Sequence, residues 1–159
     1  MRIRIVCVGR LKEPYFLEAE AEFCRRLGRY APTEVVEVAD EPAPESLSAA
    51  QRRQVMAREA QRLLERIRPE EYVIALDARG TRRTSEAFAA RLAALRDGGT
   101  RCATFLIGGS LGLGEAAFSR AAETLSLSDM TLPHRIARLV LLEQVYRAQK
   151  INAGEPYHK

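Results

Sequence analysis

The residues best suited to chemistry lie in two loops, each directly after an apolar run typical of a β-strand. One is Gly108-Gly-Ser-Leu-Gly-Leu-Gly114, after Ala103–Ile107, and the other is Ser128-Asp-Met-Thr-Leu-Pro-His134, after Thr124–Leu127. Turns at strand ends leave backbone N–H and C=O groups unpaired, and open α/β sheets bind ligands at the carboxyl ends of their strands. Glycines let a ligand lie against the backbone, although such loops are often only turns. Together the loops predict one small-ligand pocket.

Two further places carry side chains that can act on a substrate. Asp77 ends a third apolar run, Tyr72–Asp77, where a carboxylate either faces a ligand or caps its own loop, Ala78–Arg83. The chain ends in Asn152-Ala-Gly-Glu-Pro-Tyr-His-Lys159, and tyrosine and histidine are types that stack on bases and exchange protons. A frayed end is the alternative interpretation of this tail. Both places remain open on the residues alone.

Several common sites are absent from the sequence. It contains no G-x-x-x-x-G-K-[ST], no G-x-G-x-x-G after the first strand and no G-x-S-x-G. Its two histidines, His134 and His158, form no helical pair, so no metal site is expected. Cys7, Cys24 and Cys102 lack C-x-x-C spacing and are interpreted as buried small hydrophobes. Phosphate-loop, classical dinucleotide and hydrolase chemistry are therefore disfavoured.

The elements that must position these loops alternate between strand and helix. A chain of 159 residues with this alternation predicts one α/β domain, residues 1–159, with a parallel sheet covered by helices on both faces. Strands are expected at residues 2–9, 34–39, 72–77, 103–108 and 124–127, and helices are expected to begin near Pro14, Ser48, Thr84, Glu115 and Pro133.

Charge suggests a polyanionic partner without proving one. The formal net charge is +4, and the pI is about 9.2. The helix expected from Ser48 carries Arg52, Arg53, Arg58, Arg62 and Arg66, which form either a solvated surface or an RNA contact. No apolar run approaches the roughly 20 residues of a membrane helix, and the opening residues form a strand rather than a signal peptide. We expect a cytoplasmic protein without a membrane contact.

The last helix, from Pro133 to about Asn152, is apolar on more than one side. Ile136 and Val140 lie on one side, whereas Leu142 and Val145 lie on another. A helix of this kind is buried on more than one face. One face would pack on its own sheet and the other on a second subunit, so we expect a homodimer.

Four ordered motifs resemble the RlmH (YbeA) family of SPOUT methyltransferases. They are Phe105-Leu-Ile-Gly-Gly-Ser-Leu-Gly-Leu, Leu125-Ser-Leu-Ser-Asp-Met-Thr-Leu-Pro-His134, Leu142-Glu-Gln-Val-Tyr-Arg-Ala and Gly154-Glu-Pro-Tyr-His-Lys159. The length and the Ile-x-Ile-Val-x-Val-Gly opening agree as well, so the resemblance covers the whole chain. It implies a SPOUT-like α/β domain with a deep trefoil knot at about residues 103–159, and S-adenosylmethionine as cofactor.

The resemblance also implies a substrate and a set of site residues. The family methylates N3 of pseudouridine 1915 in 23S ribosomal RNA, within the assembled 70S ribosome and without a metal. Arg147, Tyr157 and His158 are the expected catalytic residues, with His134 either behind them or structural. The expected cofactor site consists of Leu76, Gly108, Leu127, Ser128, Asp129, Met130, Thr131 and Leu132.

Three other functions compete with this one. The first is a non-catalytic ribosome-associated RNA-binding protein, which the basic charge allows but which gives the two loops no purpose. The second is a small-molecule enzyme using another nucleotide, against which the missing glycine pattern counts. The third is a SPOUT methyltransferase acting on another RNA such as tRNA, which charge alone does not exclude.

Overall fold

Five parallel strands form one sheet in the order β2-β1-β4-β3-β5, with every neighbouring pair parallel. The structure is a computed structural model and describes residues 1–157. The strands are β1 (Arg2–Val8), β2 (Thr33–Val38), β3 (Tyr72–Arg82), β4 (Cys102–Ile107) and β5 (Glu123–Ser126). The helices are α1 (Pro14–Leu27), α2 (Ala49–Leu64), α3 (Ser85–Asp97), α4 (Glu115–Arg120) and α5 (His134–Asn152). The predicted parallel α/β architecture is confirmed.

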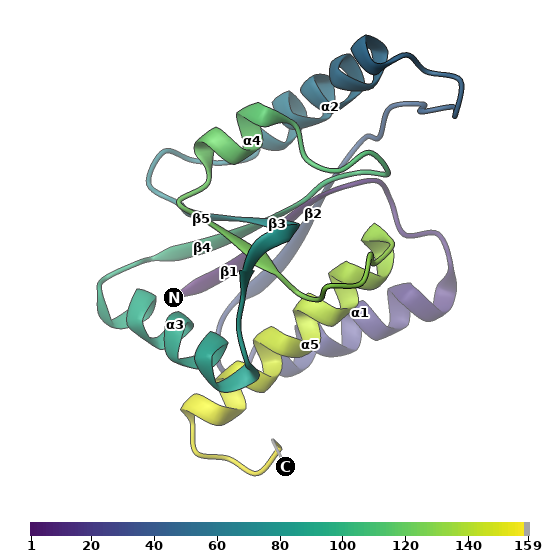
Figure 1. The fold of residues 1–159 in the computed structure, drawn as a ribbon. Helices are drawn as coiled ribbons and strands as arrows, with labels where there is room; N and C mark the ends of the chain where they lie inside the picture. Colours follow the sequence, from purple (N-terminus) through teal and green to yellow (C-terminus); the bar gives the residue numbers. More distant parts are fainter. Residues whose placement is uncertain (158–159) are drawn as a thin grey trace.

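Two helical layers cover the sheet, with α2 and α4 on one face and α1, α3 and α5 on the other (Figure 1). Successive side chains of a strand point to opposite faces, so each central strand supplies both layers. In β1, Ile3 and Ile5 belong to the core beneath α1, α3 and α5, whereas Val6 and Val8 belong to the core beneath α2 and α4. This double burial explains why β1 and β4 are nearly continuous apolar runs.

A buried ionic cluster fixes α5 against the sheet. Arg138 of α5 is 4% exposed and bonds to Glu20 of α1 and to Glu37 of β2, the latter at 2.8 Å. The same oxygen of Glu37, Oε1, also accepts the backbone N–H of Leu11 at 3.1 Å. Because Arg138 lies one turn into α5, this cluster sets the position of the helix start, which borders the ligand loops.

The third strand is longer than the sequence predicts. We expected a loop over 78–83, but β3 extends to Arg82 and changes register with β5 between Leu76 and Thr81. Leu125 of β5 pairs with both Leu76 and Thr81, so residues 77–80 form an excursion between two paired stretches. That excursion lies at the carboxyl end of the apolar part of β3, beside the ligand loops.

The arginine-rich face of α2 is largely occupied by the loop that precedes it. The helix begins where it was expected, with Ser48 as its N-cap, which forms a capping box with Gln51. Arg52 donates to the carbonyl oxygens of Glu45 and Leu47, and Arg62 donates to the carbonyl oxygen of Ala39. Arg58 and Arg62 also pair with Glu41. These arginines therefore hold residues 39–47 against the helix.

Within residues 1–157, no helix is long and apolar enough to cross a membrane. The C-terminal knot and the homodimer stay predictions.

Candidate functional site

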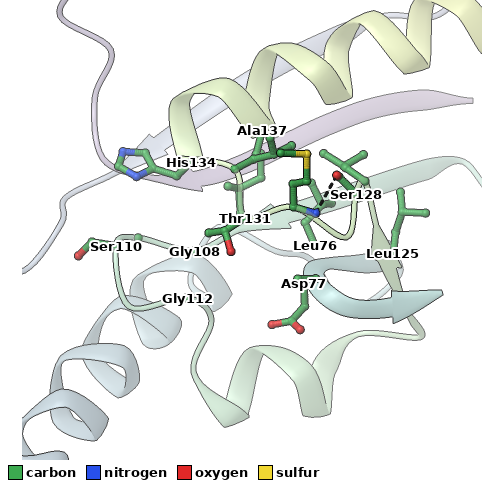
Figure 2. Close-up of a pocket in the computed structure, with 16 residues that line it drawn as sticks. Leu76, Asp77, Gly108, Ser110, Gly112, Leu125, Ser128, Thr131, His134 and Ala137 are labelled. Carbon is green, nitrogen blue, oxygen red and sulfur yellow. Dashed lines mark hydrogen bonds between the residues drawn. The ribbon is translucent and has the colours of Figure 1, made fainter. Parts of the chain in front are cut away.

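A cavity of about 230 Å³ lies at the carboxyl ends of β3, β4 and β5, between both ligand loops and the start of α5 (Figure 2). Parallel strands place their carboxyl ends at one edge of the sheet, and that is why segments distant in sequence meet there. The cavity is lined by Leu76, Asp77, Ala78, Ile107, Gly108, Gly109, Ser110, Gly112, Leu125, Leu127, Ser128, Met130, Thr131, Leu132, His134 and Ala137.

The glycine loop is a tight turn folded on itself. The N–H of Gly112 donates to the carbonyl oxygen of Gly109 at 3.0 Å. A Cβ on Gly108 would lie 2.4 Å from the carbonyl carbon of Gly112 and 2.5 Å from its oxygen. No side chain fits there, because non-bonded carbon atoms approach only to about 3.5–4.0 Å. The turn itself therefore requires glycine at position 108. The missing side chain also leaves backbone exposed to the cavity.

Serine side chains hold the second loop. The Ser126 hydroxyl donates to the carbonyl oxygen of Ser128 at 3.0 Å, and the N–H of Met130 donates to Ser128 Oγ at 2.9 Å, the dashed line in Figure 2. Such local side-chain bonds replace the strand ladder where β5 ends. Met130 itself is 76% exposed at the mouth of the cavity. The loop is thus shaped by its own hydroxyls and presents apolar side chains and backbone to a ligand.

Asp77 both caps its loop and faces the cavity. Its Oδ1 accepts the backbone N–H of Arg79 at 2.9 Å and the Nε–H of Arg79 at 2.8 Å. The hydrogen bond from the Arg79 side chain lowers the pKa of Asp77, while partial burial opposes that shift. Asp77 is therefore an anionic acceptor at neutral pH, positioned on the cavity wall.

His134 lines the cavity on the side of Ser110 (Figure 2). Burial lowers its pKa, and the positive charges of Arg135 and Arg138 act in the same direction, whereas Asp40 acts against them. The neutral imidazole, which can accept a proton, is therefore favoured at neutral pH.

The cavity gathers seven of the eight residues predicted for the cofactor site. Leu76, Gly108, Leu127, Ser128, Met130, Thr131 and Leu132 all line it. The eighth, Asp129, is absent from the lining, and its side chain is 63% exposed and pairs with Arg82 at 2.5 Å. Arg82 ends β3 and Asp129 follows β5, so their ion pair links the end of β3 to the outer side of the 128–134 loop.

Two of the predicted catalytic residues, Arg147 and Tyr157, do not line this cavity. Arg147 pairs with Glu143 at 2.6 Å, and its guanidinium lies 4.8 Å from the ring centroid of Tyr157. The Tyr157 hydroxyl donates to Glu143 at 3.2 Å, and its ring packs edge-on against Tyr146. Ten residues of α5 separate Arg147 from Ala137 of the cavity, which is about 15 Å at 1.5 Å per residue. His158 lies outside the described residues.

Sequence reasoning missed part of the lining. Ala78, Ile107, Leu125 and Ala137 were not chosen as site residues, yet each contributes to the wall. The available signal was position alone, since each lies at a strand end or at the start of α5. Within residues 1–157, no group of three or more His, Cys, Asp or Glu side chains is placed to hold a metal ion.

A family model identifies the class of this protein as SPOUT methyltransferase. A family profile described as "Predicted SPOUT methyltransferase" matches residues 1–158. A probable methylase family protein from Haemophilus influenzae Rd KW20 shares the fold with a TM-score of 0.53 at 15% identity, over 99% of this chain and 70% of that one. A protein of Legionella pneumophila, solved with the bound cofactor SAM, has a TM-score of 0.52 at 12% identity, over 93% of this chain and 66% of that one.

Relatives that match over their full length identify the particular family of methyltransferases. The chain is 52% identical to Ribosomal RNA large subunit methyltransferase H of Limosilactobacillus reuteri (strain DSM 20016), with 100% of both chains covered. It is 51% identical to the protein of the same name from Lactobacillus delbrueckii subsp. bulgaricus (strain ATCC BAA-365 / Lb-18), again over 100% of both. The chain belongs to the RlmH family of SPOUT methyltransferases.

Proposed function

We propose that the protein transfers the methyl group of S-adenosylmethionine to large-subunit ribosomal RNA, at N3 of pseudouridine 1915 in 23S rRNA of the assembled ribosome. The observation that carries this proposal is the cavity at the carboxyl ends of β3, β4 and β5, which is walled in part by Leu127, Ser128, Met130, Thr131 and Leu132. Family membership supports the reaction class, and the names of the relatives support ribosomal RNA as the substrate. The N3 position rests on the motif resemblance.

The lining suits S-adenosylmethionine chemically. Leu76, Leu125 and Leu127 offer an apolar surface for a purine face, and the short polar side chains of Ser128 and Thr131 lie beside exposed backbone. Sites for drug-sized ligands enclose about 300–1,000 Å³. The cavity encloses only about 230 Å³, so part of such a ligand would lie at the mouth, beneath the exposed side chain of Met130.

Charge at the cavity also fits this cofactor. When bound, S-adenosylmethionine supplies an activated methyl group on a cationic sulfur. Asp77 is the anionic group of the cavity wall, because its pKa is lowered, and it can accept hydrogen bonds or face a positive charge. The residues of the chain then have two tasks, which are to align N3 with the methyl group and to accept the N3 proton.

Two histidines are candidates for the proton acceptor. His158 is the choice implied by the tail motif, with Tyr157 stacking on the base and Arg147 holding a phosphate or a uracil carbonyl. His134 is favoured by position, since it lines the cavity and its lowered pKa keeps it neutral. Comparing pH–rate profiles of His134→Gln and His158→Gln separates them, because only loss of the true acceptor removes the acidic limb.

A homodimer accounts for the separation between cavity and tail. Arg147, whose guanidinium lies over the Tyr157 ring, is about 15 Å along α5 from its own cavity. A second subunit packed on the exposed side of α5, where Ile136 is 37% exposed, would bring another tail near the cavity. Light scattering at micromolar concentration tests this arrangement, and a monomer mass would exclude it.

The decisive experiment combines binding with product mapping. Isothermal titration should show one S-adenosylmethionine site per chain. Ribosomes from cells lacking the gene should gain one methyl group, on one pseudouridine of 23S rRNA, when incubated with the protein and cofactor. Deleting Gly154–Lys159 should abolish methyl transfer and leave cofactor binding nearly unchanged. Methylation of tRNA instead, or full turnover by the truncated protein, would contradict the proposal.

A further inference from the structure

A second cavity lies at the opposite end of the sheet from the cofactor loops. Its volume is about 510 Å³, and it opens at the amino ends of β1, β2 and β4. In Figure 1 the marked N-terminus lies at this end of the strands, whereas the loop between β4 and α4 lies at the other. The lining consists of Met1, Arg2, Arg4, Pro32, Glu34, Arg68, Glu70, Glu71, Arg101 and Cys102.

The floor of this cavity is an internally bonded ionic cluster in which one arginine, Arg4, faces two carboxylates, Glu34 and Glu71, so its formal charge is −1. Glu71, which is 6% exposed, accepts two hydrogen bonds from Arg4, at 2.7 and 2.8 Å, and one from the Thr104 hydroxyl at 2.6 Å. Arg4 also pairs with Glu34 at 2.5 Å and donates to the carbonyl oxygen of Arg66. The floor therefore has little capacity for a ligand of its own, and it gives the walls a fixed base.

The walls carry positive charge that lacks a partner. Arg2, Arg68 and Arg101 are exposed, and none of their guanidinium groups forms a hydrogen bond or ion pair with another of residues 1–157. The backbone N–H of Arg2 donates to the carbonyl oxygen of Arg101 at 2.8 Å, so two like charges extend from neighbouring strand ends. Glu70 is the single lining carboxylate that does not bond to Arg4.

One wall is braced by helix α4, which covers the same face of the sheet as the side chain of Arg4. Arg120 of α4 donates to the carbonyl oxygens of Arg68, Pro69 and Glu71 at 3.0–3.2 Å. These bonds fix the backbone of residues 68–71, from which the Arg68 side chain extends into the cavity wall. The charged groups are therefore carried on a braced segment and on two strand ends, and not on a free loop.

We propose that this cavity binds a backbone phosphodiester of RNA, so that the protein contacts the ribosome at both ends of its sheet. Arginine forks match phosphate oxygens, and an anion would relieve the repulsion between Arg2 and Arg101. The volume lies within the range of small-ligand sites, which leaves room for one nucleotide step. The seven residues of β1 separate the two cavities by about 23 Å, so each would contact a different RNA segment.

This inference rests on the proposed function only in naming RNA as the anion. The test compares Arg2→Gln/Arg101→Gln with Arg29→Gln/Arg53→Gln, which removes the same charge from exposed positions that line neither cavity. Affinity for 70S ribosomes is measured between 50 and 200 mM salt. Each phosphate contact contributes roughly 0.7–0.9 to the slope of log affinity against log salt. Because one phosphodiester is bound, the slope should fall by about 0.7–0.9 in the first variant and by clearly less in the control.

Two further arms make the outcome unambiguous. Urea unfolding and S-adenosylmethionine titration should match wild type in both variants, which separates a lost contact from a folding defect. Inorganic pyrophosphate, followed by NMR at the amides of Arg2 and Arg101, tests for a free anion. Equal slopes for the two variants, or saturable pyrophosphate binding with unchanged ribosome affinity, would overturn the proposal. Failure of wild type to methylate rRNA despite a reduced slope in the first variant would instead refute the proposed function alone.

Discussion

Replacing Gly108 by alanine tests the cofactor loop most directly. The new Cβ would lie 2.4 Å from the Gly112 carbonyl carbon, where contact begins at about 3.5 Å, so the turn must open by about 1 Å. Overpacking of this kind costs about 1–3 kcal/mol. We expect the free energy of unfolding to fall by that amount in urea titrations. Because the turn is also the cavity wall, S-adenosylmethionine affinity in calorimetry should drop about 5- to 150-fold.

Gly28→Ala provides the matched control for this prediction. Gly28 ends α1 with φ −53°, and its nearest non-local atom to a new Cβ is the Arg25 carbonyl oxygen at 3.3 Å. Alanine adopts that backbone conformation readily, and the contact with the Arg25 carbonyl is only slightly tight, so stability should stay within about 1 kcal/mol of wild type, with cofactor affinity unchanged. Wild-type stability and affinity in Gly108→Ala would show that the turn yields freely, and the close-packing argument would fail.

Four other predictions follow from buried or paired groups. Arg138→Met strips two glutamates of their partner and should cost about 3–5 kcal/mol in urea unfolding, so a loss below about 1 kcal/mol would contradict the buried cluster. Burial raises the pKa of Cys7 to about 12, so Ellman's reagent at pH 8 should label this thiol only after unfolding, and rapid native labelling would be inconsistent with its environment. Ser48→Ala should cost about 1 kcal/mol by loss of the capping box, whereas an unchanged urea midpoint would deny that box a role. The hydrogen bond from Arg62 lowers the pKa of Glu41, so its contribution is present above an unfolded pKa of about 4.3 and is lost as pH falls through the lower folded value. The urea midpoint of Glu41→Gln should accordingly fall less than that of wild type between pH 5 and 3.

The fold was predictable because continuous apolar runs in the sequence indicate strands that are buried on both faces. Ile5 and Phe105 lie in apolar runs that only a sheet covered on both faces can bury. The cavity was predictable for a related reason, since parallel topology gathers every loop that follows a strand at one edge. Motif resemblance then selected which loop residues face inward, and seven of the eight do line the cavity.

What the sequence could not show depends on contacts between distant segments. Residues 78–82 lack an apolar pattern, yet Thr81 and Arg82 rejoin the sheet by pairing with Leu125 and Ser126 of β5. That extension brings Arg82 to Asp129, and the resulting ion pair turns Asp129 away from the cavity. The loop over 39–47 likewise consumes arginines of α2 that periodicity alone leaves on a bare surface. In each case a long-range pairing decided the outcome and local propensity did not.

The dispersed walls of the cofactor cavity have a consequence for biosynthesis. Its lining comes from the ends of β3 and β4 and from residues 125–137, so a nascent chain that has emerged only through α4 lacks one wall entirely. Such non-local contacts form late and slowly. A ligand of the cavity at 100 times its dissociation constant adds about 2.7 kcal/mol of stability, and only to chains whose α5 has docked. Cofactor supply during translation would therefore select completed molecules over truncated ones before either meets its substrate.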